Sequence, residues 1–135
     1  MKSRKHWPLA ALVLLVAASG CGESRYVRVS GRLTYKGEPI PNTYVTFAPD
    51  DGSRPSRGKT DADGKFALHV QPRHEGVVRG MHTVFLTYNP PPPGEETAAE
   101  KHLQQVIARY SDSKTTSLRY EVTHDGQFIE IKLDQ

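Results

Sequence analysis

Apolar and polar residues alternate in short runs along most of the chain, and this period of two constrains the fold more than any other feature. In the first run Val27, Val29, Leu33 and Tyr35 fall on one side, with polar residues between them. A period of two places successive side chains on opposite faces of a β-strand. Similar runs recur at 43–48, 66–70, 77–88, 118–122 and 129–133. The pattern predicts about seven short, half-buried strands.

Turn signals separate these runs. Gly37 and Pro39 end the first run, and Gly64 and Gly126 each follow an aspartate. Glycine supplies the backbone conformation that tight turns need, and proline blocks continuation of a strand. We expect residues 50–57 to form a polar loop. Short strands with regular turn signals are typical of an all-β, antiparallel sandwich rather than an α/β fold.

Residues 95–110 have a different period. Ala99, Leu103, Val106, Ile107 and Tyr110 lie at helical spacing. The prolines at 90–93 just before them favour a stiff polyproline II spacer. One alternative is a projecting segment that docks a partner. The interpretation favoured here is an inserted helix whose apolar face packs over the sandwich.

The first twenty residues have the features of an export signal. Basic residues at 2, 4 and 5 precede the apolar run 9–18, which ends in small residues before Cys21. About 20 helical residues are needed to cross a hydrocarbon core, so this run is too short for a stable span. The residues Ala18-Ser19-Gly20-Cys21 resemble a bacterial lipobox. That resemblance implies acylation of Cys21, including an N-linked palmitate-type chain, and cleavage after residue 20.

The predicted organisation is a lipoprotein signal peptide at 1–20, a lipidated tether at 21–25 and one domain at 26–135. Two or three acyl chains hold a protein firmly on a membrane where one chain would not. By the same resemblance, Gly22 after the cysteine favours the outer membrane of a bacterial cell envelope. The alternatives are an ordinary secretory signal and an uncleaved anchor helix.

Removal of the signal also changes the charge. The whole chain has 18 basic and 15 acidic residues, and the loss of Lys2, Arg4 and Lys5 leaves 15 of each. No later segment clusters lysine and arginine in the way that phosphate binding needs. The sequence therefore predicts a membrane-attached protein without a nucleic-acid partner.

Several segments resemble the carboxypeptidase regulatory-like, or transthyretin-like, modules. The usual pattern is a V-x-G strand, a G-x-P turn, a strand ending in F-x-P and a T-D-x-D-G-x-F hairpin. The matching residues are 29–33, 37–42, 45–49 and 60–66. The tail, at 107–112, 115–118 and 121–122, is similar to that of short bacterial lipoproteins that carry this module. The resemblance implies a transthyretin-like or Ig-like β-sandwich with no assigned catalysis.

Asp61 and Asp63 could seed a calcium site, because calcium prefers carboxylates at alternating positions. The stretch after them holds Lys65 and Phe66 in place of further acidic ligands. A structural turn, in which aspartate caps its own backbone, is the favoured interpretation. Asp50 and Asp51 could contribute across the loop ends.

Histidines and nucleophiles give no recognisable site. The six histidines lack metal-ligand spacing, although His69 and His82 could meet across a sheet. There is no G-x-S-x-G motif, and acylation would occupy the lone cysteine. The transthyretin-like hydrolase that ends in Y-R-G-S is a remote alternative, since this chain ends Lys132-Leu133-Asp134-Gln135. We expect no metal, no cofactor and no catalytic residues.

The resulting hypothesis is a non-enzymatic, lipid-anchored β-sandwich that acts as a structural or protein-interaction module, with an envelope protein as a possible partner. The alternative is an anchored module that binds calcium or a glycan. A glycan site would present exposed aromatic rings on one face, with Tyr35, Tyr44, Tyr88 and Tyr120 as candidates.

Overall fold

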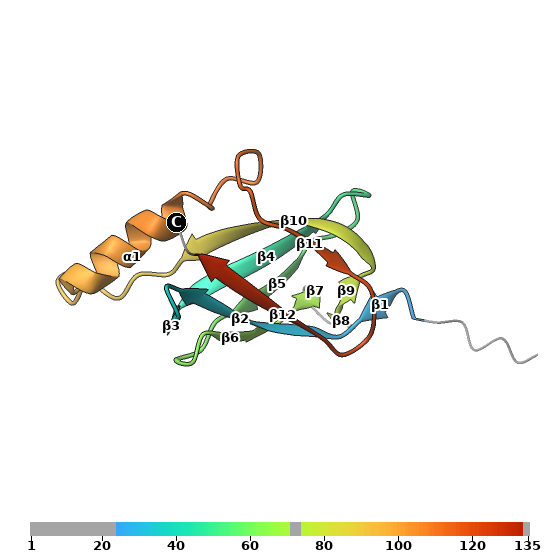
Figure 1. Cartoon of the computed structure of the whole chain (residues 1–135), viewed down its shortest axis with the longest axis horizontal. Coiled ribbons are helices and arrows are strands. Elements are labelled where there is room, and N and C mark those ends of the chain that lie inside the picture. The colour runs from blue at the N-terminus through green and yellow to red at the C-terminus, as the bar shows by residue number, and fades with distance from the viewer. Residues whose placement is uncertain (1–23, 71–73, 134–135) are drawn as a thin grey trace, which may run out of the picture.

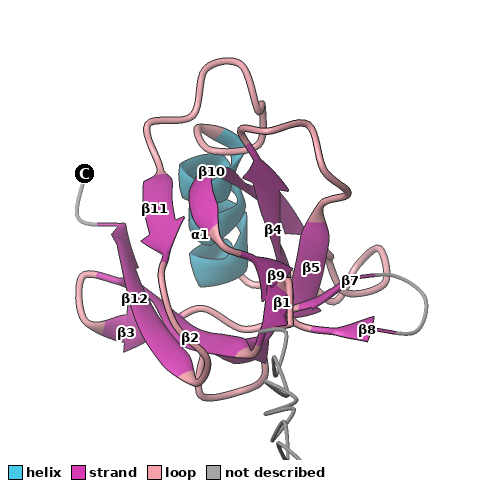
Figure 2. Ribbon diagram, turned by 90° about the vertical axis from the view of Figure 1, so that its right-hand side faces the viewer, coloured by secondary structure: helices cyan, strands magenta, loops and turns pink. Residues whose placement is uncertain are grey.

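The computed structural model describes residues 24–70 and 74–133. The predicted signal peptide and the lipidation residue Cys21 lie outside these residues, as does the start of the tether. Among the described residues are twelve strand segments and one helix. They form an all-β sandwich in which two layers of strands face each other (Figure 2).

The larger sheet is antiparallel throughout. Its strand order is β11 (Arg119–Val122), β10 (Gly80–Tyr88), β4 (Thr43–Pro49), β5 (Ser56–Lys59), β7 (His69–Val70) and β8 (His74–Glu75). The longest pairing joins β10 to β4, from His82 opposite Pro49 to Tyr88 opposite Thr43. This long central pair is the platform on which the shorter strands assemble.

The smaller sheet is built around β2 (Val29–Tyr35). One edge of β2 pairs with β12 (Gln127–Leu133), and the other pairs with β3 (Glu38–Pro39) and β6 (Lys65–Ala67). A separate two-stranded sheet joins β1 (Tyr26–Val27) to β9 (Val77–Val78).

One pairing departs from the predicted antiparallel arrangement, because β12 runs parallel to β2. The turn before β12 explains this direction. The Arg28 backbone N–H donates to the Asp125 carboxylate at 2.8 Å, and the Gly126 N–H donates to the Arg28 carbonyl at 2.9 Å. These bonds hold the start of β12 beside the start of β2, so the two strands leave in the same direction.

The core lies between the two sheets and follows the predicted alternation. The inward residues of β2, β4, β10 and β12 are buried, with Leu33, Phe47, Leu86 and Ile131 fully so. Burial of a large apolar side chain contributes about 1.5–3 kcal/mol relative to leaving it exposed. The period-two prediction of the inward faces is therefore confirmed for these four strands.

The inserted helix is α1 (Ala98–Ala108), shorter than the predicted segment. Thr97 caps it: its hydroxyl accepts from the Glu100 N–H at 3.2 Å, and the Glu100 carboxylate accepts from the Thr97 N–H at 2.6 Å. These two bonds form a capping box, which fixes where the helix begins. The hydrogen bonds that Glu100 accepts from Thr97 lower the pKa of its carboxyl.

The helix packs on the sandwich, as the favoured interpretation predicted. Val106 and Ile107 are buried in the core, and Leu103 and Tyr110 pack against it. Figure 1 places α1 at the end of the sandwich opposite β1. The proline run does not reach the helix as one extended spacer, because a turn closes it where the Glu95 N–H donates to the Pro92 carbonyl at 3.1 Å.

Several strand assignments from the sequence were wrong. The runs predicted at 27–35 and 66–70 are each divided between two sheets, as β1 and β2 and as β6 and β7. Ser56 and Arg57, predicted in a loop, begin β5, because backbone pairing with β4 and β7 makes a strand of a segment without apolar side chains. The predicted strand at 77–88 is divided into β9 and β10, and β10 begins at Gly80, whose φ is 122°. This positive φ is accessible to glycine and rarely to other residues, and it lets β9 pair with β1 in place of the larger sheet.

Candidate functional site

The turn at Asp61 and Asp63 is held by its own hydrogen bonds. The Asp61 carboxylate accepts from the backbone N–H groups of Asp63 and Lys65, each at 2.9 Å. The Gly64 N–H donates to the Asp61 carbonyl at 3.0 Å, and Gly64 has a φ of 73°. An aspartate that caps its own turn is the structural role expected of this motif. Within the described residues there is no group of three or more histidine, cysteine, aspartate or glutamate side chains placed to hold a metal ion.

Asp50 and Asp51 lie in the loop before β5, whereas Asp61 and Asp63 lie in the turn after it. A four-residue strand spans roughly 13 Å, so the two pairs of carboxylates are separated by its length. Asp50 forms an ion pair with Arg119. Asp51 accepts from the Ser53 N–H at 2.8 Å, and hydrogen bonds from Ser53 lower the pKa of its carboxyl. The two pairs therefore do not form one site.

The expectation that His69 and His82 could meet across a sheet is wrong. β4 and β5 lie between the strands that carry them, and His69 is exposed whereas His82 is fully buried. His82 Nε2 lies 2.8 Å from the Val78 carbonyl oxygen, and its ring centroid is 5.7 Å from that of Phe47. Within the described part of the chain, Nδ1 of His82 has no hydrogen-bond partner. This histidine is a core residue.

The four candidate tyrosines do not share one face. Tyr35, Tyr88 and Tyr120 pack against the core cluster. Burial raises the pKa of Tyr88 and of Tyr120, and nearby Glu100 and Glu96 add to the effect at Tyr88. Tyr44 alone projects from the outer face of the larger sheet, because its neighbours Thr43 and Val45 point inward.

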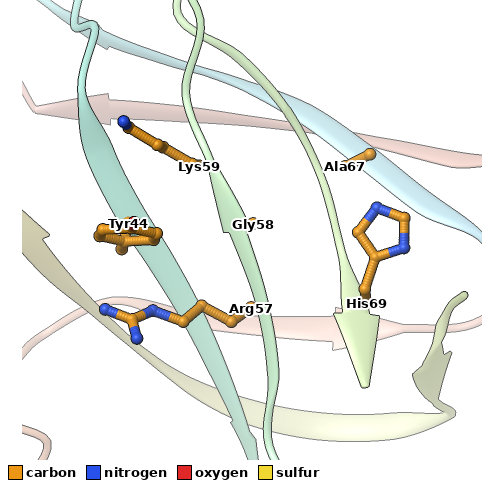
Figure 3. Close-up of a pocket in the computed structure, with 6 residues that line it drawn as sticks. All are labelled: Tyr44, Arg57, Gly58, Lys59, Ala67 and His69. Carbon is orange, nitrogen blue, oxygen red and sulfur yellow. The ribbon is translucent and has the colours of Figure 1, made fainter. Parts of the chain in front are cut away.

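Around Tyr44 lies an open groove, which we call the basic groove. Its lining residues are Tyr44, Arg57, Gly58, Lys59, Ala67 and His69. Figure 3 shows Arg57 and Lys59 on either side of the Tyr44 ring, with His69 across the groove and no side chain at Gly58 between them. The Arg57 guanidinium carbon lies 3.9 Å from the Tyr44 ring centroid, and Lys59 Nζ lies 5.8 Å from it. Cations at such distances are attracted to the face of an aromatic ring.

The floor of the basic groove results from a strand that changes sheets. After the Asp61 turn, β6 pairs with β2 in the smaller sheet. The Leu68 N–H then donates to the Val29 carbonyl, and the next residues return as β7 to pair with β5. The motif predicts a regular hairpin, but β5 and β6 belong to different sheets, so the turn does not form one. Because the chain crosses from the larger sheet to the smaller one and back, a hollow remains beside β5, and Gly58 and Ala67 form its floor.

The charge of the basic groove has one sign. Its lining residues include arginine, lysine and histidine but no acidic residue. Within the described ranges, neither Arg57 nor Lys59 takes part in an ion pair. In β5, Arg57 and Lys59 are exposed, whereas Ser56 and Gly58 are buried. The groove is thus suited to hold an anion.

Sequence reasoning identified Tyr44 but missed its partners. The sequence predicts Arg57 at the end of a loop and His69 beside His82, and it gives Lys59 no neighbour. The signal that could have found them is the alternation of small and basic residues in Ser56-Arg57-Gly58-Lys59.

No helix among the described residues is long and apolar enough to cross a membrane. No model of a protein family, no curated protein and no solved structure matches the chain.

Proposed function

We propose that this chain is a bacterial lipoprotein: a transthyretin-like β-sandwich without enzymatic activity, attached to the cell envelope through acylated Cys21, where it acts as an interaction module. The anchor is supported by the basic, apolar and small-residue segments that precede Cys21. The resemblance of residues 27–133 to carboxypeptidase regulatory-like modules supports the fold family.

The observation that carries the interaction role is the basic groove on the outer face of β4, β5 and β7. Its side chains come from a rigid sheet, and its charge is not neutralised by any acidic lining residue. A site of this kind can hold a ligand or partner by charge and hydrogen bonding. It offers cations and a tyrosine ring rather than a nucleophile activated by a neighbouring base.

The anchor would orient the domain. β1 begins at Tyr26, so only a few residues connect Cys21 to the folded part. Helix α1 lies at the opposite end of the sandwich from β1 (Figure 1). In the proposed orientation the β1 end faces the membrane, the helix end points away, and the basic groove opens sideways into the envelope space.

Replacement of the acylated cysteine tests the anchor. We expect Cys21→Ser to abolish acylation and to move the protein from the detergent phase to the aqueous phase in a phase-partition experiment. Ser24→Ala, three residues further on, is the matched control and should stay in the detergent phase. Mass spectrometry of the mature N-terminus should find acyl chains on Cys21 of the unmodified protein. A Cys21→Ser protein that remains in the detergent phase would show that the anchor lies elsewhere.

A second experiment tests the interaction role. Crosslinking of the intact lipoprotein in cells, through a photoreactive residue placed at Ala67, which is exposed and lines the groove, should capture the same envelope component in repeated experiments. The equivalent probe at Lys101 on α1 is the control. Equal capture from the two positions would count against a binding role for the groove.

A further inference from the structure

We propose that the basic groove binds carboxylate groups of an acidic polysaccharide, with Arg57 and Lys59 as the anion-binding residues and Tyr44 as the ring that positions them. This inference rests on the proposed function, because it requires the groove to face the envelope space.

The two cations are held against the Tyr44 ring before any ligand arrives. The guanidinium of Arg57 lies over the Tyr44 ring at 3.9 Å, and Lys59 is paired with Tyr44 in the strand register. Long basic side chains lose much rotamer entropy when they bind a ligand. A side chain that is already held in place before binding loses less. A stacked guanidinium also presents its N–H fork outward, which suits bidentate contact with a carboxylate.

The spacing of the two cations limits the shape of the ligand. Arg57 and Lys59 are two residues apart on the same face of β5, which separates them by roughly 6.6 Å along the strand. His69 lies directly opposite Arg57 in the pairing of β5 with β7. A ligand that engages both β5 cations must carry more than one anionic group or extend along the strand. A polymer with a carboxylate on successive units meets this requirement.

The basic groove is open and polar. Gly58 and Ala67 make a floor of backbone and one methyl group, and the groove has no pocket lined by large apolar side chains. Exposed large apolar residues in the described chain are Met81 and Phe128, neither of which lines the groove. Protein interfaces usually have an apolar centre, and nucleic-acid sites use many phosphate contacts. A hydrated, charged polysaccharide fits a shallow polar groove better than either.

Calorimetric titration of the full chain in nonionic detergent tests the proposal. The probes are a galacturonic acid hexamer, a neutral galactose hexamer and a glutamate hexapeptide. The variant is the double substitution Arg57→Gln with Lys59→Gln. Its matched control, Lys101→Gln with Lys114→Gln, removes the same charge from exposed positions outside the groove. Thermal melts of both variants establish that they fold.

We expect the unmodified chain to bind the galacturonate hexamer in preference to both other probes. Loss of two charge-assisted contacts should weaken this binding roughly 10-fold or more in the groove variant. The control variant should bind within about two-fold of the unmodified chain, since exposed charges beyond a screening length contribute little. Tyr44→Leu should weaken binding less than the double substitution, because both cations remain.

Three results would overturn the proposal: no binding of galacturonate, equal weakening in the groove and control variants, or tighter binding of the glutamate peptide. The last result would assign the groove to an acidic protein segment. These outcomes are separate from the anchor test. An acylated chain that ignores galacturonate refutes only this inference, whereas a chain that binds galacturonate but carries no lipid refutes only the anchored function.

Discussion

Substitution of Gly58 by alanine tests the close approach that shapes the floor of the basic groove. A Cβ atom added at Gly58 would lie 2.3 Å from the Ala67 carbonyl oxygen and 3.0 Å from its carbon. Ordinary contacts begin at 3.4 Å, so β5 and residue 67 would have to separate by about 1 Å. Because the obstacle is backbone, no side-chain rotation can relieve it.

The expected cost combines three effects. Overpacking of a tight site costs about 1–3 kcal/mol. Separation of the strands would weaken the adjacent pairing of Arg57 with His69, where a backbone hydrogen bond is worth about 1 kcal/mol. Alanine also lowers the entropy of the unfolded chain, which offsets about 0.4–1 kcal/mol. We therefore expect the free energy of unfolding to fall by about 2 kcal/mol, which corresponds to a Tm about 10 °C lower.

Urea unfolding of the full chain, followed by circular dichroism, measures this change. Gly52→Ala is the comparison, because that position has no atoms within 4 Å of an added Cβ and only its φ of 78° opposes alanine. Amide exchange should locate the damage, with protection lost at 56–57 and 69–70 before it is lost in β2. A Gly58→Ala protein as stable as the unmodified chain would refute the close approach, and so would one with unchanged exchange at β5 and β7.

Two further predictions concern stability. The carboxyl of Asp125 has a pKa of about 2 against an ordinary 3.8, because Arg28 donates hydrogen bonds to it. A carboxyl whose pKa is lower in the folded chain than in the unfolded chain stabilises the fold at pH values above its ordinary pKa. This contribution is lost as the pH falls through the pKa of the folded state. The urea midpoint should therefore drop between pH 3.8 and about 2, and Asp125→Asn should flatten that decline; an unchanged profile would contradict the role of Arg28. Thr97→Ala removes the cap of α1 and should cost about 1 kcal/mol. Amide exchange should then accelerate within 98–108 more than in β2, and equal acceleration in both would argue against local capping.

Local pattern was sufficient to predict the inward faces of the long strands. In β4, Val45 and Phe47 point to the core, and in β12 so do Ile129, Ile131 and Leu133. Alternation reports which face of a strand is buried, because side-chain direction reverses at every residue. Helical spacing likewise predicted that Val106 and Ile107 are buried, because residues three or four apart share one face of a helix, whereas Ala99 at the start of the same pattern is exposed.

Alternation of apolar and polar residues does not predict strand β5. Ser-Arg-Gly-Lys has no apolar residue, so nothing in its composition marks a strand. Its inward side is made by Ser56, whose hydroxyl donates to the Gly76 carbonyl at 3.0 Å, and by Gly58 against the Ala67 backbone. Both contacts come from segments distant in sequence, so only the folded chain could place β5 in the sheet.

The sequence by itself determined the all-β class, the buried faces and the position of the helix, and it is the sole basis for the acylation proposed at Cys21. Tertiary structure decided which strands pair, including the parallel pairing of β12 with β2 and the change of sheet between β6 and β7. The physical reason is that strand pairing uses backbone groups, which are nearly the same in every residue. Periodicity therefore predicts the face of a strand but not its neighbour, and the basic groove exists because neighbours bring Tyr44, Arg57 and His69 together.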